Sequence, residues 1–290
     1  MPIGARIPTK NPNRWEVDPE PEPDQAIWAK LSITAEGSDG GIIDAEIIRP
    51  RSWILRNGIC AGRMLPFNLP ELEVSGLALV HAIDDCPSIA GGEGSVVTAR
   101  FVTREVHVVA SVDVLGADGT VETITGTTIH PVWSVDRQEW VPLIELSEDE
   151  TLQGLDGLVV VLSVTLSRVT QPVYNIEVHG EHVYQVGELG VVVHNTCIPK
   201  VAEPKLGKLV RDLFKGTKVP NPIGTGSTAD AVRNELLTGL PTGGRFHSQK
   251  AVEYMNALTK WLNKNPNASH YDQLVARSLI EDLQAALMGK

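Results

Sequence analysis

The 290-residue chain is poor in cysteine and has no zinc-ligand pattern. Its three cysteines, Cys60, Cys86 and Cys197, lie far apart and are odd in number, which argues against a disulfide scaffold. No CxxC pair and no Cys/His pair at ligand spacing is present, so the sequence predicts no metal site and no cofactor. Cys60 is expected to be a small, buried hydrophobic residue.

Long hydrophobic runs are also missing. Apolar runs such as 158–162 and 191–193 have the length of strands and are too short to cross a bilayer. The N-terminus lacks the apolar run of a signal peptide, so any export is expected to depend on a fused or partner module. The polar start suits a fragment of a longer chain. Hydrophobic residues still make up 42% of the sequence, enough for one large domain or two ordinary ones.

Positive charge is scarce before residue 196. Residues 1–195 carry 12 basic and 28 acidic side chains, a net charge of −16, whereas residues 196–290 carry 13 and 8, a net charge of +5. A basic tail behind an acidic body is typical of a module directed to nucleic acid or another anion. Because +5 is modest, solvated lysines and arginines on a plain helical surface explain it as well.

Three segments differ in their residue pattern. Residues 1–26 are polar and rich in proline, as in a linker. Residues 27–195 contain runs with period-two alternation and many β-branched side chains, and Asp118-Gly119 between two runs signals a hairpin. Residues 196–290 show helical periodicity. The expected fold is an all-β domain followed by a small, mostly α-helical C-terminal domain.

The expected elements are short. Separate strands are predicted over 77–83, 94–102, 105–115, 157–169 and 173–178. Helices are predicted over 204–214, 227–238, 248–264 and 269–288. Ser227 and Ser269 are the expected N-caps of the second and fourth of these helices. Trp261, Leu262, Leu274, Leu279 and Leu283 fall at helical spacing and are expected to form the core of the tail.

Two segments of the β-rich region carry a recognisable motif. Residues 124–146, ITGTTIHPVWSVDRQEWVPLIEL, contain a Thr-x-x-His motif from Thr127 to His130, and residues 173–195, VYNIEVHGEHVYQVGELGVVVHN, end in His-Asn. In this order and at this β-to-α boundary they resemble blocks of the HINT (hedgehog/intein) superfamily. Within it, the region from about residue 27 to Asn195 is similar to the pretoxin-HINT domains of bacterial polymorphic toxins.

The resemblance implies autoproteolysis after Asn195. The side-chain amide of Asn195 would attack its own carbonyl carbon, a succinimide would form, and the bond to Thr196 would break. His194 is expected to polarise the scissile carbonyl or to donate a proton to the leaving amine. His182, on the neighbouring strand, is expected by analogy to activate the Asn195 amide.

The same resemblance assigns Thr127 and His130 to the upstream junction, where they strain and polarise an amide. Inteins begin with a Cys or Ser nucleophile, and no Cys-Phe-x-x-Gly-Thr start is found here. Cys60, followed by Ala61-Gly62, resembles such a start only weakly, because the residues after it do not fit the pattern. Full splicing is therefore not expected, although Thr196 would be its downstream hydroxyl nucleophile.

The resemblance implies that residues 196–290 are a toxin domain, because polymorphic toxins carry their variable toxin domain after the HINT domain. The segment GGRFHSQK, 243–250, precedes a predicted helix. His247 is the predicted general base, and Arg245 and Lys250 are predicted to hold a phosphate. Asp230, Arg233 and Glu235 on the preceding helix are predicted to complete this site. The loop NPIGTGSTAD, which leads into that helix, resembles an anion-binding turn.

The sequence shows no tight acidic/His metal cluster in the tail. A metal-independent nuclease acting on RNA is therefore predicted ahead of one acting on DNA. The implied partners are a cognate immunity protein, nucleic acid as substrate, and the N-terminal delivery region of a longer toxin chain. The implied location is a secreted effector that acts in the cytoplasm of a target cell.

Two other interpretations stay open at this point. One is an intein-like protein-splicing element, with the tail as its downstream host segment. The other is a non-catalytic β-rich structural or interaction protein with a helical extension, in which the His-Asn pair is accidental.

Overall fold

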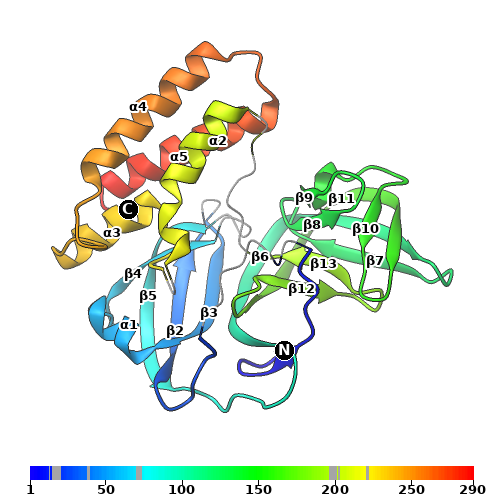
Figure 1. The fold of residues 1–290 in the computed structure, drawn as a ribbon, viewed down its shortest axis with the longest axis horizontal. Coiled ribbons are helices and arrows are strands. Elements are labelled where there is room, and N and C mark those ends of the chain that lie inside the picture. The colour runs from blue at the N-terminus through cyan, green and yellow to red at the C-terminus, as the bar shows by residue number, and fades with distance from the viewer. Residues whose placement is uncertain are drawn as a thin grey trace.

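The computed structural model describes residues 1–290 except 13, 15–20, 38–39, 70–73, 196–200, 202 and 220–221. A β-rich part extends to Asn195, and a helical part follows it (Figure 1). The strands are β1 (Arg6–Ile7), β2 (Trp28–Glu36), β3 (Ile42–Pro50), β4 (Met64–Leu69), β5 (Val74–Asp85), β6 (Ser95–Gly116), β7 (Val121–Gly126), β8 (Pro131–Ser134), β9 (Glu139–Pro142), β10 (Thr151–Gln153), β11 (Leu158–Val178), β12 (Val183–Val186) and β13 (Val191–His194). The helices are α1 (Arg51–Arg56), α2 (Pro204–Leu213), α3 (Thr228–Thr238), α4 (Ser248–Lys264) and α5 (His270–Leu287), with 3-10 turns η3 (Leu143–Glu145) and η4 (Lys215–Lys218).

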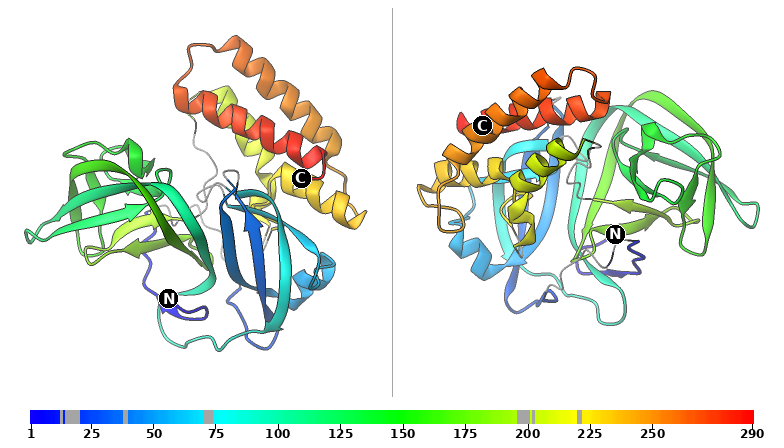
Figure 2. Two further views of the ribbon diagram at one scale, coloured as in Figure 1. Left: turned by 180° about the vertical axis from the view of Figure 1, so that it is seen from behind. Right: turned by 45° about the horizontal axis from the view of Figure 1, so that its top comes forward.

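The strands form two lobes that share one antiparallel sheet (Figures 1 and 2). The strand order is β12-β13-β8-β10-β11-β6-β3-β2-β5-β4. The long strands β6 and β11 pair along most of their lengths, and β6 contributes to the cores of both lobes. We call β2–β5, α1 and the adjoining half of β6 the first β lobe, and β7–β13 with the other half of β6 the second β lobe. Each lobe encloses its own hydrophobic cluster.

The two long strands differ from the short strands that the sequence predicts. The predicted strands 94–102 and 105–115 are one strand, β6, and the predicted strands 157–169 and 173–178 are one strand, β11. The register between β6 and β11 shifts on both sides of Gln171. A bulge changes which face the next side chains occupy, so the alternation breaks while the backbone pairing continues. The prediction of separate strands was wrong for this reason.

The helical predictions are confirmed. Ser227 and Ser269 cap α3 and α5 by accepting a hydrogen bond from the backbone N–H three residues on, and Gly239, with φ of 70°, ends α3. The hydrophobic core of this part contains Trp261, Leu279 and Leu283 as expected, Leu262 packs against it partly buried, and the side chain of Leu274 lies outside the described part. The predicted hairpin at Asp118-Gly119 is likewise confirmed between β6 and β7. Within the described chain, no helix is both long and apolar enough to span a membrane.

The N-terminal arm and one cysteine differ from expectation. The described part of residues 1–26 packs on the sheet and is not a free linker: β1 pairs with β6, and Arg6 binds Glu22 at 2.7 Å. Cys60 is exposed and not buried, because it lies in the turn between α1 and β4. Cys86 is the buried cysteine of the first β lobe.

The contact of the arm with β6 can be tested with two glycines of similar backbone conformation. Gly94, with φ of 91°, would place a Cβ 2.5 Å from the carbonyl oxygen of Ile7, whereas Gly119, with φ of 87°, has nothing within 4 Å. Alanine at either position strains a left-handed backbone by roughly 1–2 kcal/mol. We expect G94A to lower the free energy of unfolding more than G119A, because only G94A also displaces β1. Equal losses in denaturant titrations would contradict a packed arm.

Candidate functional site

Three segments of the second β lobe meet at the end of β13. Asn195 directly follows β13, and its backbone N–H donates to the carbonyl oxygen of His182 at 3.0 Å. On the other side, Val193 of β13 pairs with Val132 of β8. Continuing this antiparallel register by two residues brings His130 opposite Asn195. The strand pairing therefore gathers three of the residues predicted from sequence at one point.

The side chain of Asn195 is buried and held. It is 1% exposed, and its Nδ2 donates to the carbonyl oxygen of Ile176 on β11 at 2.7 Å. The neighbouring Asn175 accepts a hydrogen bond from the Tyr184 hydroxyl at 2.7 Å. The Tyr184 ring in turn lies with its centroid 6.4 Å from that of His130, in an edge-to-face arrangement. Contacts therefore run from β8 through β12 and β11 to the Asn195 amide.

His194 lies on the other face of β13. Val193 belongs to the core of the second β lobe, whereas Val192 packs in a separate cluster with Trp133. The His194 ring has its centroid 4.8 Å from that of Trp140 and is tilted by 59°. Since successive side chains of a strand point to opposite faces, His194 is positioned beside the backbone at Asn195 and not beside its amide.

The Thr-x-x-His motif forms a turn that presents His130. The backbone N–H of His130 donates to the carbonyl oxygen of Thr127 at 3.1 Å, and the His130 carbonyl accepts from Leu143 at 3.0 Å. Burial lowers the pKa of His130 from 6.5 to about 4. At neutral pH the imidazole is therefore uncharged, and it acts as a hydrogen-bonding group and not as a cation.

A half-buried ion pair supports the segment that leads to His182. Arg49 of β3 donates twice to the Glu177 carboxylate, at 2.9 Å to each oxygen, and Thr98 donates to it at 2.6 Å. Burial alone raises the pKa of Glu177, but Arg49, the charge of His182 and the Thr98 hydroxyl outweigh it and lower this pKa to about 2. His182 itself has φ of 51°, a left-handed conformation that is uncommon outside glycine.

Sequence reasoning missed the groups that hold the site. The Ile176 acceptor is a backbone carbonyl, which no side-chain motif reveals. Arg49 and Glu177 are 128 residues apart and meet only through the pairing of β3, β6 and β11. The predicted nucleophile Thr196 lies outside the described residues.

In the helical part, the structure brings His247 and Glu235 together. The His247 Nδ1 lies 2.7 Å from Glu235 Oε1, and the His247 backbone N–H donates to Oε2 at 2.8 Å. The Glu235 side chain is 5% exposed, and that of His247 is 12% exposed. A buried carboxylate thus fixes the orientation of the imidazole at the start of α4. Arg245 is exposed two residues before His247.

Arg233 is not part of this cluster. Its side chain is 1% exposed, and its guanidinium donates to Asp282 of α5 at 2.6 Å. Residues two apart on a helix point in nearly opposite directions, so Arg233 faces α5 while Glu235 faces His247. Lys250 is also committed elsewhere, since its Nζ donates to the carbonyl oxygen of Asp212 at 2.7 Å, and burial lowers its pKa. Of the basic residues predicted for this site, Arg245 is the exposed one, whereas Arg233 and Lys250 contact other groups.

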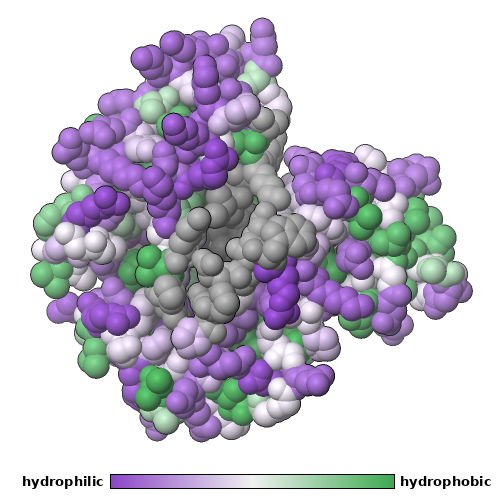
Figure 3. Space-filling model, viewed as in Figure 1, coloured by the Kyte–Doolittle hydropathy of each residue, from purple (hydrophilic) through white to green (hydrophobic). Residues whose placement is uncertain are grey.

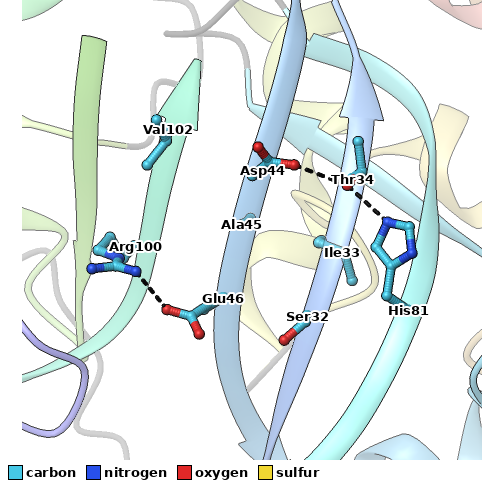
Figure 4. A pocket seen from close by; sticks show the side chains of 9 residues that line it. All are labelled: Ser32, Ile33, Thr34, Asp44, Ala45, Glu46, His81, Arg100 and Val102. Carbon is cyan, nitrogen blue, oxygen red and sulfur yellow. Dashed lines mark hydrogen bonds and ion pairs between the residues drawn. The ribbon is translucent and has the colours of Figure 1, made fainter. Parts of the chain in front are cut away.

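A separate small cavity, of about 160 Å³, opens on the sheet face of the first β lobe (Figure 4). Thr34 donates to Asp44 at 3.0 Å and meets the His81 ring at 2.8 Å, while Arg100 donates to Glu46 at 2.9 Å. These charged groups pair with one another. None of the nine residues that line the cavity belongs to the cluster around Asn195.

The Glu177 ion pair predicts acid sensitivity. Its pKa in the folded state, about 2, lies below the usual 4.5, so its charge stabilises the fold above pH 4.5, and this contribution is lost as the pH falls from 4.5 to 2. The shift corresponds to roughly 3 kcal/mol. We expect E177Q to lower the free energy of unfolding at pH 7 and to flatten its pH dependence between 5 and 2. E188Q, at an exposed position, is the matched control and should keep the wild-type pH dependence. If E177Q also kept the wild-type pH dependence of the free energy of unfolding, the stabilising role of the Glu177 charge would be contradicted.

Comparisons with known proteins concern the β-rich part. No family model matches the sequence, and no curated protein matches it significantly. Solved inteins are similar to it. A bacterial intein-like domain from Clostridium thermocellum shows 23% identity over 58% of this chain and 98% of its own, with a TM-score of 0.31. The TvoVMA intein shows 15% identity over 58% and 98%, with a TM-score of 0.32. A DnaB intein from Synechocystis shows 18% over 58% and 99%, with a TM-score of 0.29. Likeness at this level leaves the function to be argued from the contacts at Asn195.

Proposed function

We propose that this chain is a self-processing protein that breaks its own Asn195–Thr196 bond by cyclisation of Asn195. The observation that carries the proposal is the fixation of Asn195 at the last position of the β-rich part. Its backbone N–H is bound to His182 and its amide to Ile176, and its side chain is 1% exposed. An ordinary polar residue at a domain boundary has no need of such burial.

The proposed reaction balances within the chain. The Asn195 Nδ2 attacks the Asn195 carbonyl carbon and loses a proton, the bond to the Thr196 nitrogen breaks, and that nitrogen gains a proton. One product ends in a succinimide, and the other begins with the free amine of Thr196. The Ile176 carbonyl supports the attack, because it orients the amide and accepts its N–H at 2.7 Å.

The histidines have separate roles in this proposal. His182, beside the negative charge of Glu177, exchanges protons with the amide or the leaving amine, and His194 polarises the scissile carbonyl from the other face of β13. His130 is neutral and contributes through its contact with Tyr184. Cleavage, and not splicing, is the proposed outcome, since splicing requires an upstream nucleophile that the sequence does not supply.

We further propose that the helical part is a toxin and a nuclease that acts on RNA. The specific support is the His247–Glu235 pair, since a carboxylate bound to Nδ1 leaves Nε2 to take a proton from a substrate hydroxyl. The exposed Arg245 would bind the phosphate, and a net charge of +5 favours an anionic substrate. A delivered toxin of this kind implies a cognate immunity protein in the producing cell.

Self-cleavage is tested by the intact mass of the purified protein. We expect two wild-type fragments that meet at 195/196, and a single uncut chain for N195A, which lacks the nucleophile. H182A is expected to slow the cleavage by at least 100-fold, because it removes the proton-transfer group. H107A, at an exposed histidine of β6, is the control and should cleave like the wild type. An uncut wild-type chain would exclude the proposal.

The nuclease proposal is tested by inducing the full chain in bacteria while following growth and RNA integrity. We expect growth arrest with degraded RNA for the wild type, a loss of at least 100-fold in RNA cleavage for H247A, and a partial loss for E235Q, in which the imidazole is no longer oriented by a charge. E253Q, on the exposed surface of α4, is the matched control. Normal growth with intact RNA would reject the nuclease and leave the self-cleavage proposal standing.

A further inference from the structure

We infer that the two products of cleavage stay bound to each other, so that breaking the peptide bond and separating the helical part are distinct steps. The inference rests on the proposed function for the cut itself. The surface that would hold the two products together is formed by contacts between the first β lobe and residues beyond position 200.

One side chain of the tail completes the core of the first β lobe. Ile223, which lies between η4 and α3, is 8% exposed. It belongs to the hydrophobic cluster of that lobe, and the apolar residues of α2–α5 form a different cluster of their own. Strand residues of the same cluster include Leu31, Ile33, Leu65, Phe67, Ala78, Val80 and Phe101. A buried apolar contact across the cut is the kind that holds two chains together in water.

The tail itself fixes the loop that carries Ile223. The backbone N–H and the hydroxyl of Thr225 donate to the buried Asp230 carboxylate at 2.9 and 3.0 Å. Gly226 lies so close to Gly216 that a Cβ on Gly216 would stand 2.4 Å from the Gly226 carbonyl oxygen. The turn predicted to cradle an anion thus uses the Thr225 amide internally, to hold Ile223 in place. Cleavage at Asn195 breaks none of these bonds, so the surface stays preorganised for binding.

The contact extends along the first β lobe. In Figures 1 and 2, α3 lies over β4 and β5, and the C-terminal end of α5 reaches β5. Gly76 of β5 would bring a Cβ within 4.0 Å of the Lys290 backbone, and Arg233 holds that backbone by donating to the Lys290 carbonyl at 2.7 Å. The buried Arg233 therefore positions the chain end against the lobe. Figure 3 shows that the outward surface of the helical part is largely hydrophilic.

The docked arrangement leaves the His247–Glu235 pair on another side of α3. Asn234, Leu237 and Thr238 line a cleft of about 260 Å³ toward the turn after α1 and toward β4. Glu235 instead faces the loop before α4. The β lobe thus retains the helical part through one face of α3, while the proposed catalytic pair lies on a different face.

The test separates docking from self-cleavage by making the cut with an added protease. In the full-length N195A chain, a recognition sequence for a site-specific protease is placed between Cys197 and Ile198, and the cut protein is followed by size-exclusion chromatography and native mass spectrometry at micromolar concentration. We expect both fragments to migrate together at the position of the uncut chain. Two separate fragments that keep their folded far-UV circular dichroism would overturn the inference, whether or not the wild type cleaves itself.

The role of Ile223 is tested by I223D in the same background. A buried aspartate at this position should raise the dissociation constant of the cut fragments by at least about 30-fold. V219D is the matched control, because Val219 lies in the same connection and is 58% exposed. I223D fragments that stay together as tightly as those of V219D would show that Ile223 does not hold the interface.

Discussion

The pairing register of β13 is the constraint on which the rest of the site depends. One edge of this four-residue strand is paired with β12 and the other with β8, so the residue after it is fixed from both sides. His182, just before β12, accepts the backbone N–H of Asn195, and the register of β13 with β8 places His130 opposite Asn195. A shift of one residue in either ladder would move every side chain to the opposite face. The two flanking valines that face the core, Val191 and Val193, keep the register from slipping.

Burial determines the chemistry of the groups gathered there. Asn195 is buried and its amide is held by a backbone carbonyl, while desolvation lowers the pKa of His130 and keeps its ring neutral. Glu177 is the exception, since a two-pronged bond from Arg49 keeps it charged. The charge of Glu177 therefore persists at neutral pH and acts on His182.

The hydrophobic cores of the protein are not divided at the position of the proposed cut. The helical part has a core of its own, yet Ile223 belongs to the core of the first β lobe. The bond after Asn195 is thus a covalent link between parts that are also joined by packing. Covalent cleavage alone alters the chain connectivity and leaves this packing intact.

Local sequence signals determined much of this architecture. The change from period-two to helical periodicity after Asn195, the serine caps of α3 and α5 and the Asp118-Gly119 hairpin are each set by residues a few positions apart. The Thr-x-x-His and His-Asn motifs likewise predicted His130, His194 and Asn195 as site residues, and His182 was added by analogy with the family. These signals act over short separations, so a single sequence carries them in full.

Tertiary structure alone decided which groups meet. Three features depend on the strand register between distant segments. They are the continuity of β6 and β11 across their bulges, the Ile176 carbonyl at the Asn195 amide, and the Arg49–Glu177 pair. The burial of Arg233 with Asp282 and the insertion of Ile223 into a β lobe depend on how helices pack. Periodicity predicts neither the strand register nor the helix packing. It shows which residues share a face, and it does not show which distant segment that face contacts.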